Sequence, residues 1–564
     1  MHTPLMDFNA ARPLIVEEVV RRVEGAIKDP LLALNDTAYH EIRRLQHAGG
    51  DEFAEWRHLA GALGKMSDHE RRDKLTELAR KYAWDVAGNF DPRVYKVVSR
   101  AGVPVLGALL KPRHILKNLA HIGDLSALDG RILVQGPTAH IRGLQNLGTL
   151  VFVPTHLSNL DSVVFGFAIE RAQLPPATYG AGKNLFTNPV LSFFMHNLGA
   201  YRVDRRLKHA LYKDVLKTYS CVMIERGYHS LFFPGGTRSR SGGVERKLKL
   251  GLAGTGIEAF ARTAERGRPQ RVFFVPATIN YLLTLEAETL IDDFLQEEGK
   301  NRYIIEDDES TRLARIVSFM QKLVKLEASV IIRFSEPLDC FGNKVDESGR
   351  SLDTHGRVID AKSYVFDPKD QPVRAPARDA QYTRELGDVI CAAFKKDTVA
   401  MSTHLVASVA FARLEQAAGV ADIFALLRHG DDVVVPRKEF LAELEELLVR
   451  AREMAAAGLL VLAPTVETAS GEEILGEALR AFAGYHSSEV ITSRGGDLVL
   501  SDTRLLFYYQ NRLAAHGLAA DRIAPPGTAG TARIGANGGS RSTPASSVRG
   551  GTLKARPEDP PAQA

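Results

Sequence analysis

The segment from residue 148 to residue 340 alternates short apolar runs with amphipathic helix patterns. In residues 207–226, for example, apolar side chains recur at the spacing that lines one face of a helix. Strands that alternate with helices predict an α/β fold with a mostly parallel sheet. The four predicted strands are Thr149–Val153, Ser230–Phe233, Arg271–Val275 and Ser329–Phe334.

Helical patterns flank this segment on both sides. Apolar residues recur at helical spacing in residues 14–27, and residues 381–520 contain a strong helix pattern that ends at Gly458. Residues 341–380 read as irregular and polar, and no internal repeat is apparent. The end of the chain is rich in Gly, Pro, Ser, Thr and Ala and has little to bury. The expected organisation is a helical N-terminal region (1–120), an α/β domain (121–345), a mainly helical C-terminal region (346–520) and a disordered tail (521–564).

Composition excludes several classes of protein. A net charge of +4 over 564 residues is small for a nucleic-acid-binding protein. The three cysteines lie far apart without CxxC spacing, which argues against a disulfide framework and against a zinc site and suits a reducing cytosol. The N-terminus has no apolar stretch after a basic start, so we expect no signal peptide.

The apolar run from Ala101 to Leu110 lies between Arg100 and Lys111. No run reaches the roughly 18–20 apolar residues that a spanning helix requires. This run is therefore either a buried core segment or a patch that dips into a lipid surface beside its cations. The second reading predicts a peripheral protein on the cytoplasmic face of a membrane.

The first predicted strand leads into the stretch VFVPTHLSNLDSVVFGF, in which His156 and Asp161 are five residues apart. Ser158, three residues before Asp161, resembles a capping box with an acid in its last position. A helix capped in this way places Asp161 in its first turn and His156 just outside. The carboxylate can then hold one imidazole nitrogen and leave the other free as a base. The alternative for a lone loop histidine is a structural or merely exposed side chain.

Three further blocks follow in order: GAYRVDRR (199–206), FPGGTRSRSG (233–242) and FVPATINY (274–281). Together with the HxxxxD block, they resemble the pattern of the glycerol-phosphate acyltransferase superfamily, and the match covers about residues 120–340. The stretch LLFYYQNRLAAHG (505–517) and the helical flanks resemble the larger glycerol-3-phosphate acyltransferases, although Gln510 stands where the family usually has Arg.

The resemblance implies roles for single residues. His156 is the expected general base and Asp161 its orienting partner. Arg205, Arg238 and Arg240 are expected to bind the acceptor phosphate, because a guanidinium group forms two parallel hydrogen bonds with it. A solvated basic surface is the alternative for these arginines. The remaining residues assigned to substrate binding are Lys183, Gly235, Gly236, Thr237, Lys249 and Pro276, the last more as a shaping residue than a chemical one.

Two positions depart from the family pattern. Gly235 stands where the family has Glu, and Arg202 stands where an aromatic or aliphatic residue is usual. The family Glu is tied to acceptor binding. A glycine there predicts a pocket that is more positive and roomier.

The implied function is transfer of a fatty acyl group from acyl-CoA or acyl carrier protein to the hydroxyl of glycerol 3-phosphate, as a step of phospholipid synthesis. Neither a metal nor a bound cofactor is implied. Lysophosphatidate and dihydroxyacetone phosphate are the alternative acceptors. A catalytically silent lipid- or acyl-binding protein is the alternative from another functional class, which Gly235 favours and the intact His156 and Asp161 disfavour.

Overall fold

The computed structural model describes residues 4–96, 98, 132–298 and 330–518, apart from 184, 185, 187, 188, 420, 421, 430, 431 and 484. The chain divides into one unit of residues 1–523 and a second of residues 524–564, and every described residue belongs to the first. The apolar run 101–110 and the tail from residue 521 lie outside the described residues, so the predictions made for them stay predictions. None of the described helices is long and apolar enough to cross a membrane.

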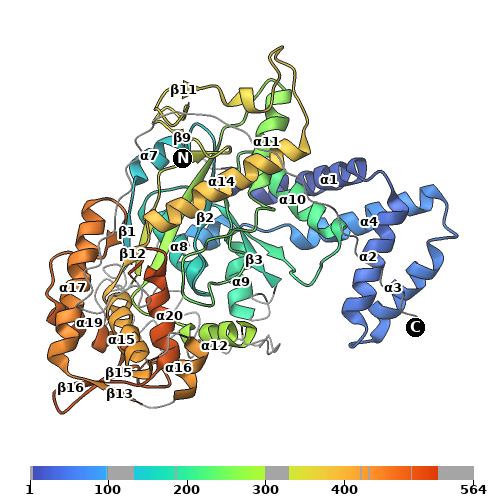
Figure 1. Cartoon of the computed structure of the whole chain (residues 1–564). Coiled ribbons are helices and arrows are strands. Elements are labelled where there is room, and N and C mark those ends of the chain that lie inside the picture. The colour runs from blue at the N-terminus through green and yellow to red at the C-terminus, as the bar shows by residue number, and fades with distance from the viewer. Residues whose placement is uncertain are drawn as a thin grey trace, which may run out of the picture. The chain divides into compact units, whose positions relative to one another are not determined.

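A mixed sheet forms the centre of the described unit (Figure 1). Its parallel part has the order β4-β3-β5-β2-β6, β7 and β8 pair antiparallel with β6, and β1 pairs parallel with β7. The α/β fold expected from the sequence is confirmed. The strands are β1 (Ile132–Gln135), β2 (Thr149–Pro154), β3 (Thr178–Gly182), β4 (Ala200–Val203), β5 (Ser230–Leu231), β6 (Val272–Tyr281), β7 (Val330–Phe334) and β8 (Leu338–Asp339).

Strand β2 is buried at all six positions because helices cover both of its faces. Leu150 and Phe152 belong to one apolar cluster, whereas Val151 and Val153 belong to another. Alternate residues of a strand point to opposite faces, so a strand covered on both sides has a continuous apolar run. The helices of this layer are α7 (Thr138–Leu144), α8 (Asp161–Arg171), α9 (Pro189–Asn197), α10 (Ala210–Glu225), α11 (Gly254–Glu265), α12 (Ala287–Glu298) and α14 (Pro376–Lys396).

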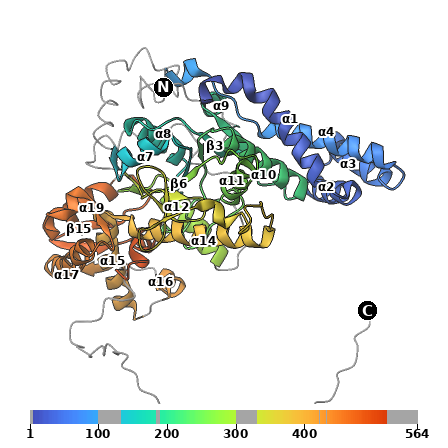
Figure 2. The ribbon, with the colours of Figure 1, turned by 90° about the horizontal axis from the view of Figure 1, so that it is seen from above.

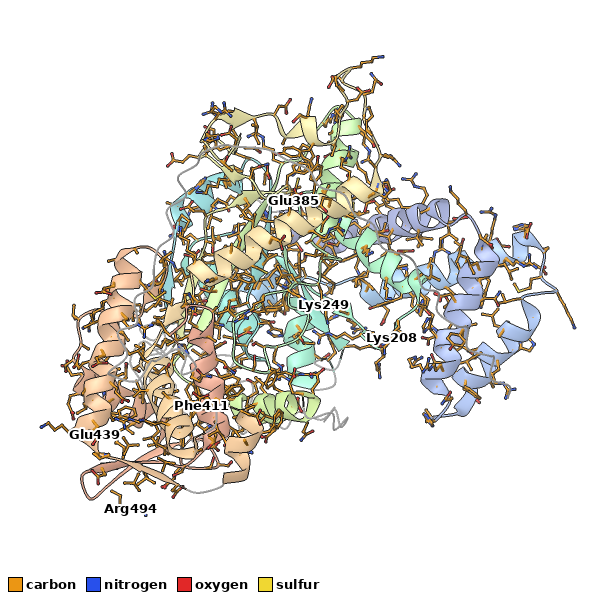
Figure 3. The ribbon with its side chains drawn as sticks, viewed as in Figure 1. Lys208, Lys249, Glu385, Phe411, Glu439 and Arg494 are labelled. Carbon is orange, nitrogen blue, oxygen red and sulfur yellow. The ribbon has the colours of Figure 1, made fainter. Side chains whose placement is uncertain are left out.

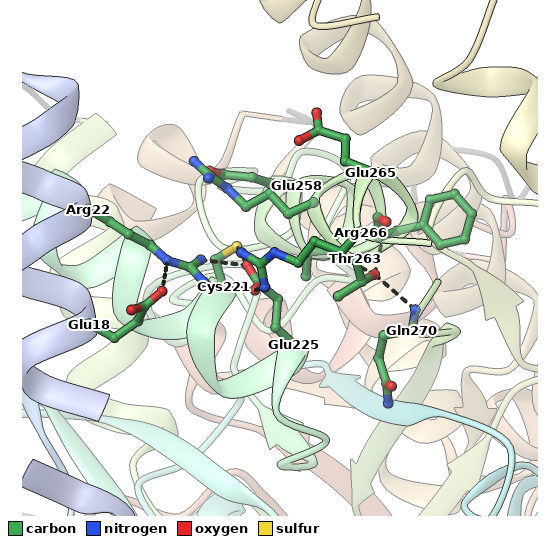
Figure 4. A network of polar contacts seen from close by, with 12 residues as sticks. Glu18, Arg22, Cys221, Glu225, Glu258, Thr263, Glu265, Arg266 and Gln270 are labelled. Carbon is green, nitrogen blue, oxygen red and sulfur yellow. Dashed lines mark hydrogen bonds and ion pairs between the residues drawn. The ribbon is translucent and has the colours of Figure 1, made fainter. Parts of the chain in front are cut away.

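Four N-terminal helices pack against α10, chiefly through α1 and α4. Arg22 of α1 points to Glu225 of α10, with Nη2 2.9 Å from Oε2, and Arg266 Nη1 lies 3.0 Å from the same oxygen (Figure 4). This buried carboxylate shared by two arginines ties α1 to the α/β layer. The helices are α1 (Phe8–Ala26), α2 (Pro30–Leu45), α3 (Gly50–Ala62) and α4 (Asp68–Val86).

The C-terminal region is mainly helical and lies on the opposite side of the sheet from α1–α4 in both ribbon views (Figures 1 and 2). Helix α17 ends just before Gly458, which has a positive φ, as its sequence indicated. The helices are α15 (Ser402–Ala418), α16 (Ile423–His429), α17 (Arg437–Ala456), α18 (Pro464–Glu467), α19 (Gly471–Phe482) and α20 (Thr503–Ala514), with short strands β12 (Val399–Ala400), β13 (Val433–Val435), β14 (Val461–Leu462), β15 (Ile491–Arg494) and β16 (Asp497–Leu500) between them.

The segment expected to be irregular, residues 341–380, contains a repeat of seven residues. Asp339, Asp346 and Asp353 each accept the backbone N–H groups two and four residues further on. A glycine with positive φ follows each of them at the third position. These turns connect β8 to three more antiparallel strands at the edge of the sheet, β9 (Lys344–Val345), β10 (Ser351–Leu352) and β11 (Val358–Ile359).

Candidate active site

His156 lies two residues beyond the end of β2, at the edge of the sheet where parallel strands present their carboxyl ends. Its Nδ1 is 2.7 Å from Oδ2 of Asp161, the first residue of α8. The Asp161 side chain is fully buried, whereas the imidazole of His156 retains 14% exposure. The pair therefore has one buried member and one that solvent or a ligand can reach.

The carboxylate of Asp161 accepts four hydrogen bonds. Oδ2 accepts from the backbone N–H groups of Leu157 (2.6 Å) and Ser158 (2.9 Å) as well as from His156, and Oδ1 accepts from the Tyr281 hydroxyl (2.7 Å). Burial and the charge of Asp161 raise the pKa of Tyr281, so its hydroxyl keeps its proton and donates it. Because an ionised carboxylate only accepts, Nδ1 of His156 carries the proton and Nε2 has the free lone pair.

The capping arrangement differs from the one predicted at Ser158. The Asp161 carboxylate does reach back to the Ser158 N–H, but helix α8 begins at Asp161 and Leu160 is its cap residue. The Ser158 hydroxyl accepts from the Leu160 N–H (3.1 Å) and donates to Glu286 Oε2 (2.7 Å). The hydroxyl is therefore used to anchor the loop to Glu286 and not to cap the helix.

The third block packs against His156 because β5, which leads into it, pairs with β2. The ring of Phe233 stacks on the imidazole of His156, with centroids 4.2 Å apart and planes 23° apart. Ser239 N–H donates to the His156 carbonyl (2.7 Å), and His156 N–H donates to Glu245 Oε1 (2.9 Å). The ring and both main-chain polar groups of His156 are thus held by residues 233–245.

The predicted phosphate-binding arginines differ in their partners. Arg238, 19% exposed, forms an ion pair with the fully buried Glu286 at 3.3 Å, and Arg240 pairs with Glu297. Arg205 forms no hydrogen bond or ion pair within the described part of the chain. Partial desolvation and the positive charge of Arg238 lower the pKa of Arg205.

Lys183 is held by carboxylates from two elements. Its Nζ lies 3.4 Å from Asp85 of α4 and 3.5 Å from Asp204 of the second block. Arg202, the second departure from the family pattern, also pairs with Asp85, at 3.6 Å. These two carboxylates do not belong to His156 or to the third block, and the part of Lys183 in substrate binding stays a prediction.

The other predicted binding residues shape the third block and its surroundings. Gly236 has a φ of +74°, and a Cβ on it would lie 2.4 Å from Cδ of Lys249, whose N–H donates to the Pro234 carbonyl (2.7 Å). The Lys249 side chain (labelled in Figure 3) therefore lies against Gly236, and the positive φ of this residue favours glycine. Thr237 is partly exposed in the same loop. Pro276 is buried within β6 opposite Val153, in keeping with a shaping role.

Residues 138–280, which contain the His156–Asp161 pair and all three arginines, match the model of a family described as Acyltransferase. This segment is an acyltransferase domain. A curated relative, the glycerol-3-phosphate acyltransferase of Xylella fastidiosa (strain M23), is 28% identical over 332 residues, which cover 57% of this chain and 34% of that protein. The glycerol-3-phosphate acyltransferase of Pseudomonas fluorescens (strain Pf0-1) is 26% identical over 203 residues, 35% of this chain and 22% of that protein.

The chain thus spans only about a fifth to a third of the length of the curated relatives it matches. A solved structure, the 1-acyl-sn-glycerophosphate acyltransferase PlsC from Thermotoga maritima, is 13% identical and covers 55% of this chain and 92% of that chain, with a TM-score of 0.24. A TM-score this low supports no comparison of individual elements.

Helix α20 supports the candidate site from outside the matched segment. Asn511 Nδ2 donates to the Ser241 carbonyl (3.0 Å), and Arg512 Nη2 donates to Asn280 Oδ1 (2.9 Å) and to the Ile279 carbonyl (3.1 Å). A Cβ on Gly242 would lie 2.2 Å from the carbonyl oxygen of Tyr508, so loop and helix are in close contact. The C-terminal stretch singled out in the sequence therefore packs directly on the third and fourth blocks.

Several residues of the candidate site were not predicted. Tyr281 ended the fourth block without an assigned role, and Phe233 opened the third. Glu245 and Glu286 are single carboxylates in connecting segments, and no spacing pattern marked them. The two glutamates also change the expected charge of the site, because the pocket predicted to lack a carboxylate at Gly235 has one beside it.

Proposed function

We propose that this protein, through its acyltransferase domain, moves a fatty acyl group from a thioester to the hydroxyl of glycerol 3-phosphate. The observation that carries the proposal is the His156–Asp161 pair, in which Asp161 fixes the proton on Nδ1 and leaves Nε2 as a base on the partly exposed side. An ordered, buried acceptor for Nδ1 is the arrangement that general-base catalysis requires. The pair also favours an enzyme over a silent acyl-binding protein.

The proposed step is direct transfer. Nε2 of His156 takes the proton of the acceptor hydroxyl while its oxygen attacks the thioester carbonyl carbon. The carbon–sulfur bond then breaks, the electron pair leaves with sulfur, and His156 returns the proton to the thiolate. General-base catalysis of this kind contributes roughly 10²–10⁴-fold. Acyl-CoA and acyl carrier protein are the two proposed donors.

Phosphate binding is proposed for Arg205 and Arg238, with Arg240 nearby in the chain. Arg205 has no partner among the described residues, and Arg238 is oriented by Glu286. A guanidinium without a protein partner, together with an oriented one, suits a phosphate dianion. Glycerol 3-phosphate is favoured as the acceptor by the names of the curated relatives and by the helix α20 stretch. Lysophosphatidate and dihydroxyacetone phosphate carry the same phosphate and remain the alternative acceptors.

The experiment is a transfer assay with labelled acyl-CoA and labelled acyl carrier protein, each offered glycerol 3-phosphate, lysophosphatidate or dihydroxyacetone phosphate. The proposal expects the highest kcat/KM with glycerol 3-phosphate. Preference for another phosphorylated acceptor would contradict the acceptor assignment but keep the acyl transfer. Failure to acylate any of the three would overturn both and favour a silent binder.

Peripheral binding to the cytoplasmic face of a membrane is proposed because the acylated product is apolar. Flotation with liposomes tests it: binding should be stronger on anionic than on neutral lipid and weaker in high salt. A protein that stays with the membrane in salt and in carbonate, and is released only by detergent, would contradict a peripheral location.

A further inference from the structure

The space beside Gly235 is filled by the side chain of Glu245. Gly235 has no positive φ, so its backbone admits an ordinary side chain. A Cβ built on Gly235 would lie 3.4 Å from both Cγ and Oε1 of Glu245, and 3.4 Å from the Thr237 carbonyl oxygen. A longer side chain at position 235 would therefore point into the volume that the Glu245 carboxyl group occupies.

Glu245 also holds the main chain of His156. Its Oε1 accepts the His156 N–H at 2.9 Å, across 89 positions of sequence. Its Oε2 is shielded from solvent and has no hydrogen-bond partner in the described residues. Burial raises the pKa of Glu245, and the hydrogen bond from the His156 N–H and the positive charge of Arg512 oppose that rise. The carboxyl group is thus directed inward at His156 and not outward to solvent.

The segment that bears Glu245 is itself fixed. Val244 is buried in the cluster formed with α10, α11 and α14, and the neighbouring Gly242 lies against α20. Ser239, in the same segment, bonds to the His156 carbonyl. Glu245 therefore approaches His156 from a rigid support, which a residue that positions another must have.

We propose that Glu245 is the positioning residue for the main chain of His156, and that it does so from the volume into which a side chain at position 235 would point. The glycine at 235 and the glutamate at 245 then belong together, because position 245 supplies the carboxylate that position 235 lacks. This proposal rests on the proposed function in so far as His156 is the base. Glu245 itself touches no reacting atom and acts only through the main chain of His156.

The first test is a kinetic double-mutant cycle with Glu245→Ala, Gly235→Glu and the two combined. Glu245→Ala should lower kcat about 10- to 100-fold, the size of effect that a small misplacement of a reacting group produces, with the KM for glycerol 3-phosphate within about twofold. Gly235→Glu alone should also lose activity, because two carboxyl groups compete for one volume. The combined variant should regain most of kcat, since a carboxylate from position 235 then reaches the His156 N–H.

Two further variants separate positioning from general damage. Glu245→Gln keeps an oxygen that accepts the His156 N–H and should retain most of kcat. Arg246→Ala changes the next, exposed residue, which forms no bond with any described residue, and should leave kcat unchanged. A combined variant no better than the worse single variant, or a Glu245→Ala with normal kcat in an active wild type, would overturn the proposal.

The same cycle measured by urea unfolding needs no activity. The urea concentration at the unfolding midpoint should change less in the combined variant than the sum of the changes in the two single variants, because the two positions share one volume. Additive shifts would show that Glu245 does not fill the space of residue 235 and would overturn the proposal. A wild type without acyl transfer would contradict the proposed function, while this cycle would still decide the placement of Glu245.

Discussion

The Ser158 hydroxyl donates to Glu286 Oε2 at 2.7 Å, although 128 residues separate the two in sequence. The other oxygen of Glu286 accepts the Asn159 N–H at 2.8 Å and lies 3.3 Å from Arg238 Nη1. One buried carboxylate therefore connects the loop that carries His156 with the third block. Glu286 fixes the position of the proposed phosphate-binding arginine relative to the proposed base.

Replacing Glu286 by Ala should lower the free energy of unfolding by about 1–3 kcal/mol, because the buried Ser158 hydroxyl and the part-buried Asn159 N–H lose their acceptor. The matched control is Glu297→Ala, since Glu297 also pairs with an arginine of the third block but is 69% exposed. That substitution should cost less than about 1 kcal/mol, as surface ion pairs do. Urea unfolding of both variants measures the difference, and equal losses would contradict the anchoring role of Glu286.

Tyr281→Phe removes the hydrogen bond to Asp161 Oδ1 without changing the ring. A bond to a charged group contributes about 1.5–3 kcal/mol, so kcat should fall about tenfold or more if Asp161 stabilises the protonated imidazole during transfer. Tyr364→Phe is the control, because the Tyr364 hydroxyl bonds to Asn343 in the repeat segment. Initial rates at saturating substrate give kcat for both variants. An unchanged kcat in Tyr281→Phe would contradict a role of the Tyr281 hydroxyl in the mechanism.

Arg205→Ala should raise the KM for glycerol 3-phosphate about tenfold while leaving the melting temperature unchanged, because Arg205 has no partner in the described residues. Arg238→Ala should raise KM and also lower the melting temperature, since it leaves the buried Glu286 without its ion pair. The control is Lys208→Ala, which removes an exposed positive charge three positions from Arg205 (Figure 3). A KM for Arg205→Ala equal to that of the control would favour the solvated-surface reading.

Stability should fall as the pH decreases below about 6.5, because three histidines are buried in the neutral form. Burial lowers the pKa of His209 and His229 to about 4 and that of His404 to about 3. In each of them Nδ1 accepts a backbone N–H, so protonation breaks a hydrogen bond. The unfolded chain binds these protons near pH 6.5 and the folded one does not, so the stabilisation is complete above pH 6.5 and is lost toward pH 4.

The slope of this dependence can be measured by urea unfolding at pH 7, 6 and 5. Each fully titrating histidine contributes up to about 1.4 kcal/mol per pH unit. His229→Gln, whose amide oxygen can accept the Leu150 N–H, should reduce the slope by the share of one histidine. The same slope in wild type and variant would contradict burial of a neutral His229.

Patterns that are local in sequence were predicted well. The four predicted strands correspond to β2, β5, β6 and β7, because buried parallel strands have continuous apolar runs. Strand β6 is longer than expected, reaching Tyr281, since its polar residues Thr278 and Asn280 are buried and hydrogen-bonded in the sheet region. The seven-residue repeat was missed because it consists mostly of polar turn residues, with a single apolar residue before each Asp, such as Val345 before Asp346 and Leu352 before Asp353.

Contacts between distant residues could not be predicted in the same way. His156 and Asp161 are only five residues apart, so their pairing was predicted from a local pattern. Glu245, Glu286 and Tyr281 reach the site across much longer separations in sequence. Such contacts depend on which strands become neighbours. The domain boundaries at residues 120 and 345 and the roles of the individual site residues stay predictions.

Acyl transfer by the His156→Ala variant tests the role of His156 as the base. We predict a loss of at least about 10²-fold in kcat at unchanged melting temperature. Asp161→Asn should be strongly impaired, and the double variant should be little worse than His156→Ala, since residues that act as a unit are not additive. His58→Ala, an exposed histidine of α3, should transfer at the wild-type rate. Near-normal transfer by a folded His156→Ala would contradict the claim that Nε2 of His156 is the base.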